Sequence, residues 1–442
     1  MDKDIVLKYF ETNRDYADKK IKEGIEKNRK GDFELCFCDD EEKFVSVRQV
    51  GHKFKFGCNA FMIGGFECKQ KEEIYRQKFK NLFNLAVVPF YWDSLEPREG
   101  ALRFGADSEY IYRRPAPDVV LEFCRQYGIE PKGHCLLWAF CNPEWLQKYG
   151  EKDKKRLIEK RFEEIAARYA GEIPSFDVVN ESASTYAVGR KNLFEGYEEF
   201  ALDMGAKYFP HSRKFLNETN DSVWNYAWAR GGKYIPFYMQ AEKLLNSGKK
   251  IDALGIQYHL FFKEEQMREE EILKSYLDPA VHFDVLETLG KLGLPMQISE
   301  VTVPSYFRSE EANAEIQAFI TEELYRLWFS VENMEGVDYW NLVDGYATGA
   351  KRGTCGGENY YGGGLLNFDM NEKPAYRALD RLINGEWKTT AEGNGVKDSF
   401  RFRGFFGTYE IEVRRQGRTE KFSLNLSAPG RYAAGEKTAV RV

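Results

Sequence analysis

The sequence predicts an α/β protein built around a (β/α)₈ (TIM) barrel, with a helical and hairpin lead-in before it and a small β module after it. Eight short apolar runs alternate with amphipathic helical patterns at intervals of about 40 residues, which is typical of a barrel of parallel strands. Polar residues gather at the carboxyl ends of these runs, where such barrels carry their working groups. We therefore expect a lead-in at 1–50, a catalytic barrel at 51–387 and a β-sandwich-like module at 388–442.

The elements follow from local patterns. Residues 1–30 are rich in lysine and glutamate and predict one helix, and "FELCFCD" and "FVSVRQV" alternate like an exposed hairpin. In "DKKRLIEKRFEEIAARYA" the apolar residues recur at three- and four-residue spacing, which is typical of a helix with one buried stripe. The barrel strands are expected at 53–59, 84–90, 132–138, 176–181, 214–218, 253–259, 295–301 and 337–344.

The last 55 residues contain alternating strands with glycine turns and no helical pattern. A module of that size buries little surface, so we expect it to pack on the barrel rather than to be stable alone. The competing architecture is a doubly wound open sheet. That fold begins with a glycine-rich phosphate turn after its first strand, and "CNAFMIGGFE" is a poor version of one. The barrel is therefore the preferred interpretation.

Composition excludes several classes of function. The net charge of −6 comes from 64 basic and 70 acidic residues that are intermixed, so no basic stripe favours nucleic acid as a partner. No apolar run approaches the roughly 20 residues of a membrane span, and the first residues lack the apolar core of a secretory signal. We therefore expect a cytoplasmic protein, or a secreted one if a signal has been removed. Oligomeric state is not indicated.

The eight cysteines are scattered, and neither a C-x-x-C pair nor a Cys/His cluster accompanies them. This pattern predicts free thiols in a reducing compartment, with no structural metal site. No cofactor is expected.

Two carboxylates carry the functional hypothesis. Glu181 ends the fourth expected strand and Glu300 the seventh, so they should face each other across the barrel mouth. Each alone could be a strand-end cap or part of a salt bridge. Together they are what cleavage of a glycosidic bond needs, because one protonates the leaving oxygen and the other attacks the anomeric carbon or activates water. The polar residues expected at the strand ends are His134, Trp138, Asn180, Glu181, Asn217, Glu218, Gln257, His259, Glu300 and Asp344.

Six motifs occur in the order seen in glycoside hydrolase family 10: "KGHCLLW", "FDVVNES", "DALGIQYHL", "MQISEV", "YWNLVD" and "GGLLNFDMNEKPAYRAL". From about residue 50 to about 385 the chain resembles a divergent member of that family, which consists mainly of endo-β-1,4-xylanases that are retaining (β/α)₈ barrels. The resemblance implies that Glu181 is the acid/base and Glu300 the nucleophile. Retention requires the two carboxyl groups to lie about 5–5.5 Å apart, with Glu181 protonated and Glu300 ionised at the start.

The resemblance also implies supporting residues. Asn180 matches the side chain that hydrogen-bonds the sugar 2-hydroxyl, and His259, with Gln257 beside it, matches the imidazole that keeps the nucleophile ionised. His134 and Trp138 match the walls of the subsite that holds the sugar under attack, and Trp340 matches its strand-eight region.

Departures from the family concern the neighbouring sugar. Members usually carry an E-N-x-M-K-W run at the end of strand two, whereas this chain has "PFYW", Pro89–Trp92, in which Phe90 and Tyr91 offer stacking surface instead. The tryptophan expected shortly after Asp344 is absent, with Tyr346 or Thr348 near its place. A glycine-rich insert, 349–364, follows as a surface loop or a flap over the cleft. Other family positions are changed to Ala139, Cys141 and Thr302.

The motifs therefore define the reaction, cleavage of a glycosidic bond, better than they define the sugar that is cleaved. A β-linked xylan or xylo-oligosaccharide is the first expectation, and another β-linked, decorated oligosaccharide is the alternative. Two other classes remain open at this point: a carbohydrate-binding barrel that has lost catalysis, and a metal-dependent hydrolase, for which only His134 and His259 stand at strand ends.

Overall fold

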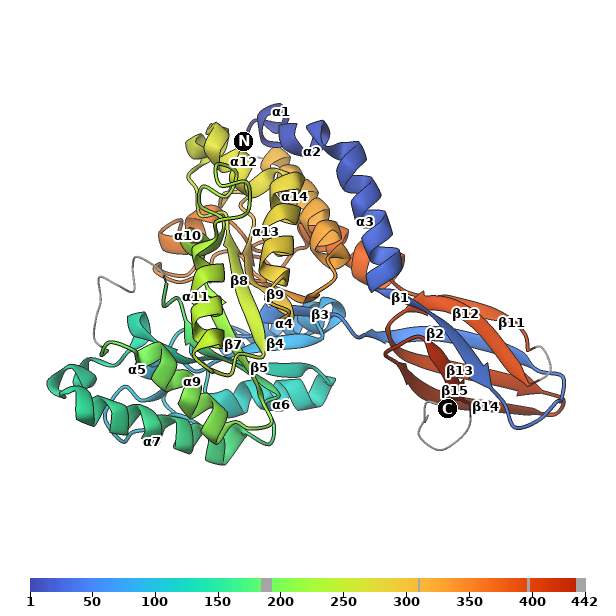
Figure 1. The fold of residues 1–442 in the computed structure, drawn as a ribbon, viewed down its shortest axis with the longest axis horizontal. Coiled ribbons are helices and arrows are strands. Elements are labelled where there is room, and N and C mark those ends of the chain that lie inside the picture. The colour runs from blue at the N-terminus through green and yellow to red at the C-terminus, as the bar shows by residue number, and fades with distance from the viewer. Residues whose placement is uncertain (184–192, 309–310, 396–397, 435–442) are drawn as a thin grey trace.

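The protein consists of a helix-wrapped barrel and a β-sandwich beside it, and the helix α3 (Arg14–Asn28) lies along the barrel and leads into the sandwich (Figure 1). This computed structural model describes residues 1–183, 193–308, 311–395 and 398–434. None of the helices in those ranges is long and apolar enough to cross a membrane.

Eight parallel strands close into the predicted barrel, in which β10 pairs with both β9 and β3. Several of them are buried along their whole length, which explains why they read as apolar runs rather than as alternating ones. In ring order the strands are β3 (Lys55–Asn59), β4 (Leu85–Pro89), β5 (Glu130–Trp138), β6 (Ser175–Asn180), β7 (Arg213–Glu218), β8 (Ala253–His259), β9 (Met296–Thr302) and β10 (Met334–Tyr339).

The eighth strand differs from its expected range, 337–344, because it ends at Tyr339. Beyond that point the backbone pairs with a later segment instead of continuing along the barrel. The carbonyl of Leu342 accepts hydrogen bonds from the amides of Leu365 and Leu366, at 3.0 and 2.9 Å. The residues of "NLVD" therefore lie in a loop at the barrel mouth.

The helices cover the outside of the barrel, and the amphipathic pattern at 153–170 forms α7 with Leu157, Phe162 and Ile165 on its buried face. The helical elements after β3 are α4 (Lys69–Leu82), α5 (Trp92–Leu95), α6 (Pro117–Tyr127), η1 (Ala139–Cys141), η2 (Glu144–Lys148), α7 (Glu151–Tyr169), α9 (Tyr197–Tyr208), α10 (Asn220–Val223), α11 (Pro236–Asn246), η3 (Glu264–Arg268), α12 (Glu270–Leu277), α13 (Pro279–Gly290), α14 (Glu311–Ser330), η4 (Gly357–Tyr361), α15 (Pro374–Asp380) and η5 (Arg381–Glu386).

Glycines on the strands make room for larger groups inside the barrel. A Cβ on Gly255 of β8 would lie 2.1 Å from Oδ1 of Asn217, and one on Gly133 of β5 would lie 2.2 Å from the Phe176 ring. Contacts of that length are not sterically possible, so the missing side chain at Gly255 leaves the space that the Asn217 amide fills.

The first 30 residues form three helices, not the single one that was expected: α1 (Lys3–Val6), α2 (Lys8–Thr12) and α3 (Arg14–Asn28). The breaks fall at Leu7 (φ −90°, ψ −3°) and Asn13 (φ −104°, ψ 14°), whose ψ values depart from those of a regular α-helix. Leu7 and Phe10 are buried, so packing against the barrel bends the chain where local propensity favours one helix.

The expected hairpin between "FELCFCD" and "FVSVRQV" does not form, because the two strands lie in different sheets. β1 pairs antiparallel with β12 and parallel with β15, whereas β2 lies between β11 and β13. The structure thus places these lead-in strands in one sandwich with the C-terminal strands. Its strands are β1 (Lys30–Cys36), β2 (Phe44–His52), β11 (Thr390–Asn394), β12 (Ser399–Phe405), β13 (Gly407–Arg415), β14 (Arg418–Leu426) and β15 (Gly430–Ala433).

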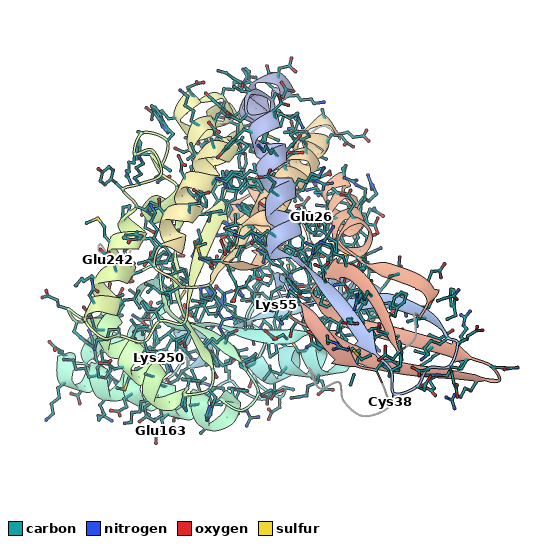
Figure 2. The ribbon with its side chains drawn as sticks, turned by 45° about the vertical axis from the view of Figure 1, so that its right-hand side comes forward. Glu26, Cys38, Lys55, Glu163, Glu242 and Lys250 are labelled. Atoms are coloured by element: carbon teal, nitrogen blue, oxygen red, sulfur yellow. The ribbon has the colours of Figure 1, made fainter. Side chains whose placement is uncertain are left out.

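Aromatic side chains connect the sandwich to the end of the barrel opposite the active-site mouth. Phe329 of α14 packs against Phe405 of the sandwich strand β12, with ring centroids 6.0 Å apart, and Trp387 stacks on Phe329 at 4.1 Å. Figure 2 shows Lys55 at this junction, whereas Cys38 lies on the sandwich away from the barrel. The sandwich therefore sits far from the carboxyl ends of the barrel strands.

Candidate active site

The polar groups expected at the strand ends meet at one side of the barrel mouth. β6, β7, β8 and β9 are consecutive in the ring, and they carry Asn180, Asn217, His259 and Glu300, with Glu181 directly after β6. The parallel order of these strands brings their carboxyl ends to a common edge, so five polar side chains far apart in sequence become neighbours.

Glu300 is a buried carboxylate that accepts hydrogen bonds from two side chains. Its Oε2 lies 3.1 Å from Nε2 of His259, and its Oε1 accepts from Nδ2 of Asn217 at 3.1 Å. Nε2 of His134 lies 3.8 Å from the same Oε1. Burial raises the pKa of Glu300 to about 7, whereas His134 and Asn217 act to lower it.

His259 is neutral at physiological pH, because burial lowers its pKa to about 4. A carboxylate only accepts hydrogen bonds, so Nε2 carries the ring hydrogen and donates it to Glu300. Nδ1 then accepts from the hydroxyl of Thr302 at 2.9 Å. The Glu300 carboxylate therefore selects this tautomer of His259, and the Thr302 hydroxyl donates to the other ring nitrogen.

Glu181 occupies different surroundings. It has a left-handed backbone conformation, with φ of 53°, which is uncommon for a residue with a side chain and is found in strained turns at functional sites. Its Oε1 accepts one hydrogen bond, from Nε2 of Gln257 at 2.8 Å. Burial raises its pKa to about 8, and the charge of Glu300 contributes to the increase.

Glu218, at the end of β7, holds the turn that follows Glu181. Its Oε1 accepts from the hydroxyl of Ser182 at 3.0 Å and from the amide of Ala183 at 2.8 Å. The side chain is fully buried, and burial raises its pKa to about 8. Glu218 therefore fixes the backbone from which Glu181 projects.

Asn217 connects Asn180 at the end of β6 to Glu300 on β9 through hydrogen bonds. Its Nδ2 donates to Oδ1 of Asn180 at 2.7 Å and to Glu300, and its Oδ1 accepts from the hydroxyl of Ser299. Sequence reasoning placed Asn217 at a strand end but gave it no role. The signal was present as an amide at the end of a buried strand, where a polar group needs partners.

A buried ion pair between Asp177 and Lys132 lies beside His134. Nδ1 of His134 donates to Oδ2 of Asp177 at 2.8 Å, and Nζ of Lys132 lies 3.1 Å from the other oxygen. Burial acts to raise the pKa of Asp177, but Lys132 and His134 outweigh it and hold that pKa below its usual value. Asp177 was recognisable as a polar residue inside an apolar strand, whereas Lys132 was not identified.

Aromatic rings form the walls around these groups. Trp340 lies edge-on to His134 and His259, with centroids 5.9 and 5.7 Å apart. Tyr91 lies edge-on to His134 at 5.3 Å, and its ring is tilted against Trp138 at 5.7 Å. The structure thus brings His134, Trp138, Trp340 and Tyr91 together, but Tyr91 is buried and the Arg114 guanidinium lies 3.9 Å from its ring centroid, so the predicted stacking surface at Tyr91 is wrong.

Two further aromatic expectations are wrong. Phe90 is fully buried and packs on Tyr169 and Phe176, so it offers no stacking surface to a substrate. Tyr346 does not join the wall, because its ring stacks on Phe368 and its hydroxyl donates to Glu67 at 2.7 Å.

Chemically, the arrangement offers two buried carboxylates in unequal surroundings, together with a neutral imidazole and amides. Within the described ranges, no three His, Cys, Asp or Glu side chains come together as possible ligands of a metal ion. The residues at the mouth can therefore donate, accept and exchange protons around a sugar held between aromatic walls.

Comparison with known proteins bears on the family and the fold of the chain. The model of the protein family described as glycosyl hydrolase family 10 matches residues 36–381. The chain belongs to this family. It is 26% identical over 427 residues to the anti-sigma-I factor RsgI6 of Acetivibrio thermocellus, covering 92% of this chain and 48% of that protein. It is 26% identical over 430 residues to endo-1,4-beta-xylanase 1 of Arabidopsis thaliana, covering 92% of this chain and 39% of that protein.

The chain thus spans about half or less of the length of these two relatives. Among solved structures, native xylanase 10B of Thermotoga maritima superimposes with a TM-score of 0.58 at 20% identity, covering 76% of this chain and 96% of that one. This likeness shows a shared fold.

Within this family 10 chain, the glycine-rich insert contributes a further carboxylate. Glu358 accepts a hydrogen bond from Nε1 of Trp340 at 3.3 Å. The sequence predicted a loop or a flap at 349–364, but nothing in the pattern singled out Glu358.

Proposed function

We propose that this chain is a retaining β-glycoside hydrolase that cleaves β-1,4-linked xylan or xylo-oligosaccharides by double displacement. In this proposal Glu181 is the acid/base and Glu300 the nucleophile. The observation that carries it is the unequal pair of buried carboxylates at one barrel mouth. Glu300 accepts from His259 and Asn217 and has Nε2 of His134 3.8 Å away, whereas Glu181 accepts from Gln257 and Trp138.

The first step needs Glu181 protonated and Glu300 ionised. The pKa of about 8 for Glu181 and about 7 for Glu300 make this the favoured arrangement of one shared proton near neutral pH. Glu181 gives its proton to the glycosidic oxygen while Glu300 attacks the anomeric carbon. The bond to the leaving sugar breaks, and an ester to Glu300 forms.

The second step reverses these roles. The ester on Glu300 is uncharged, so the repulsion that helps to raise the pKa of Glu181 disappears. Glu181 then takes a proton from water, the water oxygen attacks the anomeric carbon, and Glu300 leaves as a carboxylate. Two inversions at the same carbon give net retention.

The substrate assignment is supported by the aromatic walls, which suit a pyranose ring, and by the xylanase name of the Arabidopsis relative. A second candidate is a barrel that binds a glycan without cleaving it. One observation favours it: the polar run that family members usually carry at the end of strand two is replaced in this chain by Pro89–Trp92.

The test is hydrolysis of an aryl β-xylobioside, followed by a panel of xylan, arabinoxylan, mixed-linkage glucan and other aryl glycosides. We expect turnover by the wild type and loss of turnover to background in Glu300→Ala. Glu163→Ala, an exposed glutamate on the outer surface of α7 (Figure 2), is the matched control and should keep full activity. Unchanged turnover in Glu300→Ala contradicts the proposal, and glycan binding without hydrolysis by the wild type decides for the second candidate.

A further inference from the structure

The glycine-rich insert delivers Glu358 to the barrel mouth. Glu358 lies in η4 and is partly buried, and its Oε2 accepts from the indole nitrogen of Trp340 at 3.3 Å. Because the Trp340 ring lies edge-on to both His134 and His259, this carboxylate is one aromatic ring away from the groups that contact Glu300.

The insert is held in a defined conformation by hydrogen bonds on both sides of Glu358. The amide of Glu358 donates to the carbonyl of Thr348 at 3.1 Å, and Oδ1 of Asn359 accepts from the amide of Ala347 at 2.7 Å. The carbonyl of Tyr361 accepts from two amides of the loop after β9, at 3.0 and 2.8 Å. These hydrogen bonds fix the position of η4 relative to the segments that follow β9 and β10.

Glycines are required by the path of the insert. Gly357 has φ of 50°, and a Cβ on it would lie 2.6 Å from the carbonyl oxygen of Thr348. Gly362 has φ of 51°, and a Cβ on it would lie 2.7 Å from the backbone of Tyr306. These two positions place the backbone of η4 close to the mouth, so Glu358 is presented there by the fold itself.

Glu358 faces charged and titratable groups of the site. Burial lowers the pKa of His259, and the negative charge of Glu358 acts against that change. The same charge also acts on Arg113, a buried guanidinium whose Nη1 donates to Asn341 and to the carbonyl of Tyr346. A carboxylate offers about four acceptor positions, and the hydrogen bond from Trp340 uses one of them.

The position of Glu358 complements that of Asn180. β6 and β10 are four places apart in the ring of eight strands, so they stand on opposite sides of the mouth. Asn180 ends β6 and Glu181 follows it, whereas Trp340 follows β10 and donates its indole hydrogen bond to Glu358. A sugar ring between the walls therefore has Asn180 on one side and Glu358 on the other.

We propose that Glu358 is a substrate contact that accepts a hydrogen bond from a free ring hydroxyl of the sugar held between Glu181 and Trp340. This inference rests on the proposed function and names a specificity residue for it. The site would select β-glycosides with a free hydroxyl at that position, because an analogue without it leaves a desolvated carboxylate unpaired.

The experiment compares an aryl β-xylobioside with its monodeoxy analogues in the wild type, Glu358→Gln and Glu358→Ala. We expect Glu358→Ala to lower kcat/KM on the parent substrate by about 10- to 100-fold, the range for a hydrogen bond to a charged group. On the one analogue that lacks the contacting hydroxyl, the same substitution should change kcat/KM less than about threefold. Glu358→Gln keeps an acceptor oxygen and should lose less than Glu358→Ala.

Arg352→Gln is the matched control, because Arg352 lies on the same insert but donates to Tyr110 instead. Arg352→Gln should leave kcat/KM unchanged, relative to the wild type, on the parent substrate and on every deoxy analogue. An equal loss on every analogue would overturn the proposal, because a residue that only holds Trp340 affects all substrates alike. Unchanged kcat/KM in Glu358→Ala would overturn it as well.

Failure of the proposed function can be told apart from failure of this inference. If the wild type hydrolyses none of the glycosides, the proposed function is wrong. Calorimetric titration of wild type and Glu358→Ala with xylotriose then tests the contact directly, and equal affinity, or no binding by the wild type, would overturn the inference. Equal melting temperatures of the two proteins would show that the substitution leaves the fold intact.

Discussion

Replacing Gln257 with alanine should extend activity to higher pH. Gln257 gives Glu181 a side-chain hydrogen bond that stabilises its charged form, at 2.8 Å, and its effect on the pKa is larger than that of the hydrogen bond from Trp138. Without that donor the charged form is less favourable, so the pKa of Glu181 rises above its value of about 8. A hydrogen bond to a charged group contributes about 1.5–3 kcal/mol, and one pKa unit corresponds to about 1.36 kcal/mol. The increase should therefore be about one unit or more.

The sign of the activity change follows from the role of Glu181. Cleavage needs its proton, so kcat/KM falls as pH rises through its pKa, and a higher pKa moves that alkaline limb upward. The assay is the pH dependence of kcat/KM on an aryl β-xylobioside. Gln240→Ala is the control, because Gln240 donates to Ser182 and not to Glu181. An alkaline limb that stays in place or moves down in Gln257→Ala would refute the assignment of Glu181 as the acid.

Three further predictions concern the groups that hold the site and the sandwich. The pKa of Glu218 is raised in the folded state, so the folded state loses stability as pH rises from about 4.5 to about 8. Glu218→Gln should therefore reduce the fall in melting temperature between pH 5 and pH 8. An equal fall in the wild type and in the variant would contradict this. Gly255→Ala should push Asn217 aside, cost about 1–3 kcal/mol of stability and lower activity more than tenfold, whereas Gly150→Ala, in open space, should do neither. Deleting 388–442 should unpair β1 and β2 and lower the melting temperature or cause aggregation; an unchanged melting temperature would show that the sandwich does not stabilise the barrel.

The sequence predicted the barrel well because its strands are defined locally. A strand such as β6 is buried on both faces, and its apolar run stands out without knowledge of its neighbours. The predicted hairpin was wrong because strand pairing is not defined locally. Alternation in β1 and β2 shows which face is buried, but it does not show which strand provides the hydrogen bonds, and the partners lie more than 340 residues away in β11, β12 and β13.

The same distinction applies to the site. Glu181, Glu300 and His259 were found because they end apolar strands inside recognisable motifs. Glu358 was not found, because its place depends on the tertiary path of a loop whose sequence is mostly glycine and polar residues. Tyr346 was misplaced because the distance in sequence from Asp344 does not show which way the loop turns after β10.

The proposed mechanism requires a covalent sugar ester on Glu300. Incubation with an activated 2-deoxy-2-fluoro β-xylobioside should trap that ester, because the fluorine slows both steps while the activated leaving group speeds only the first, so the ester accumulates. Mass spectrometry of the digested protein should then find one added 2-fluoro-xylobiosyl group on the peptide that contains Glu300, and none in Glu300→Gln. A label on another residue, or turnover with inversion of the anomeric carbon and no label, would contradict the account.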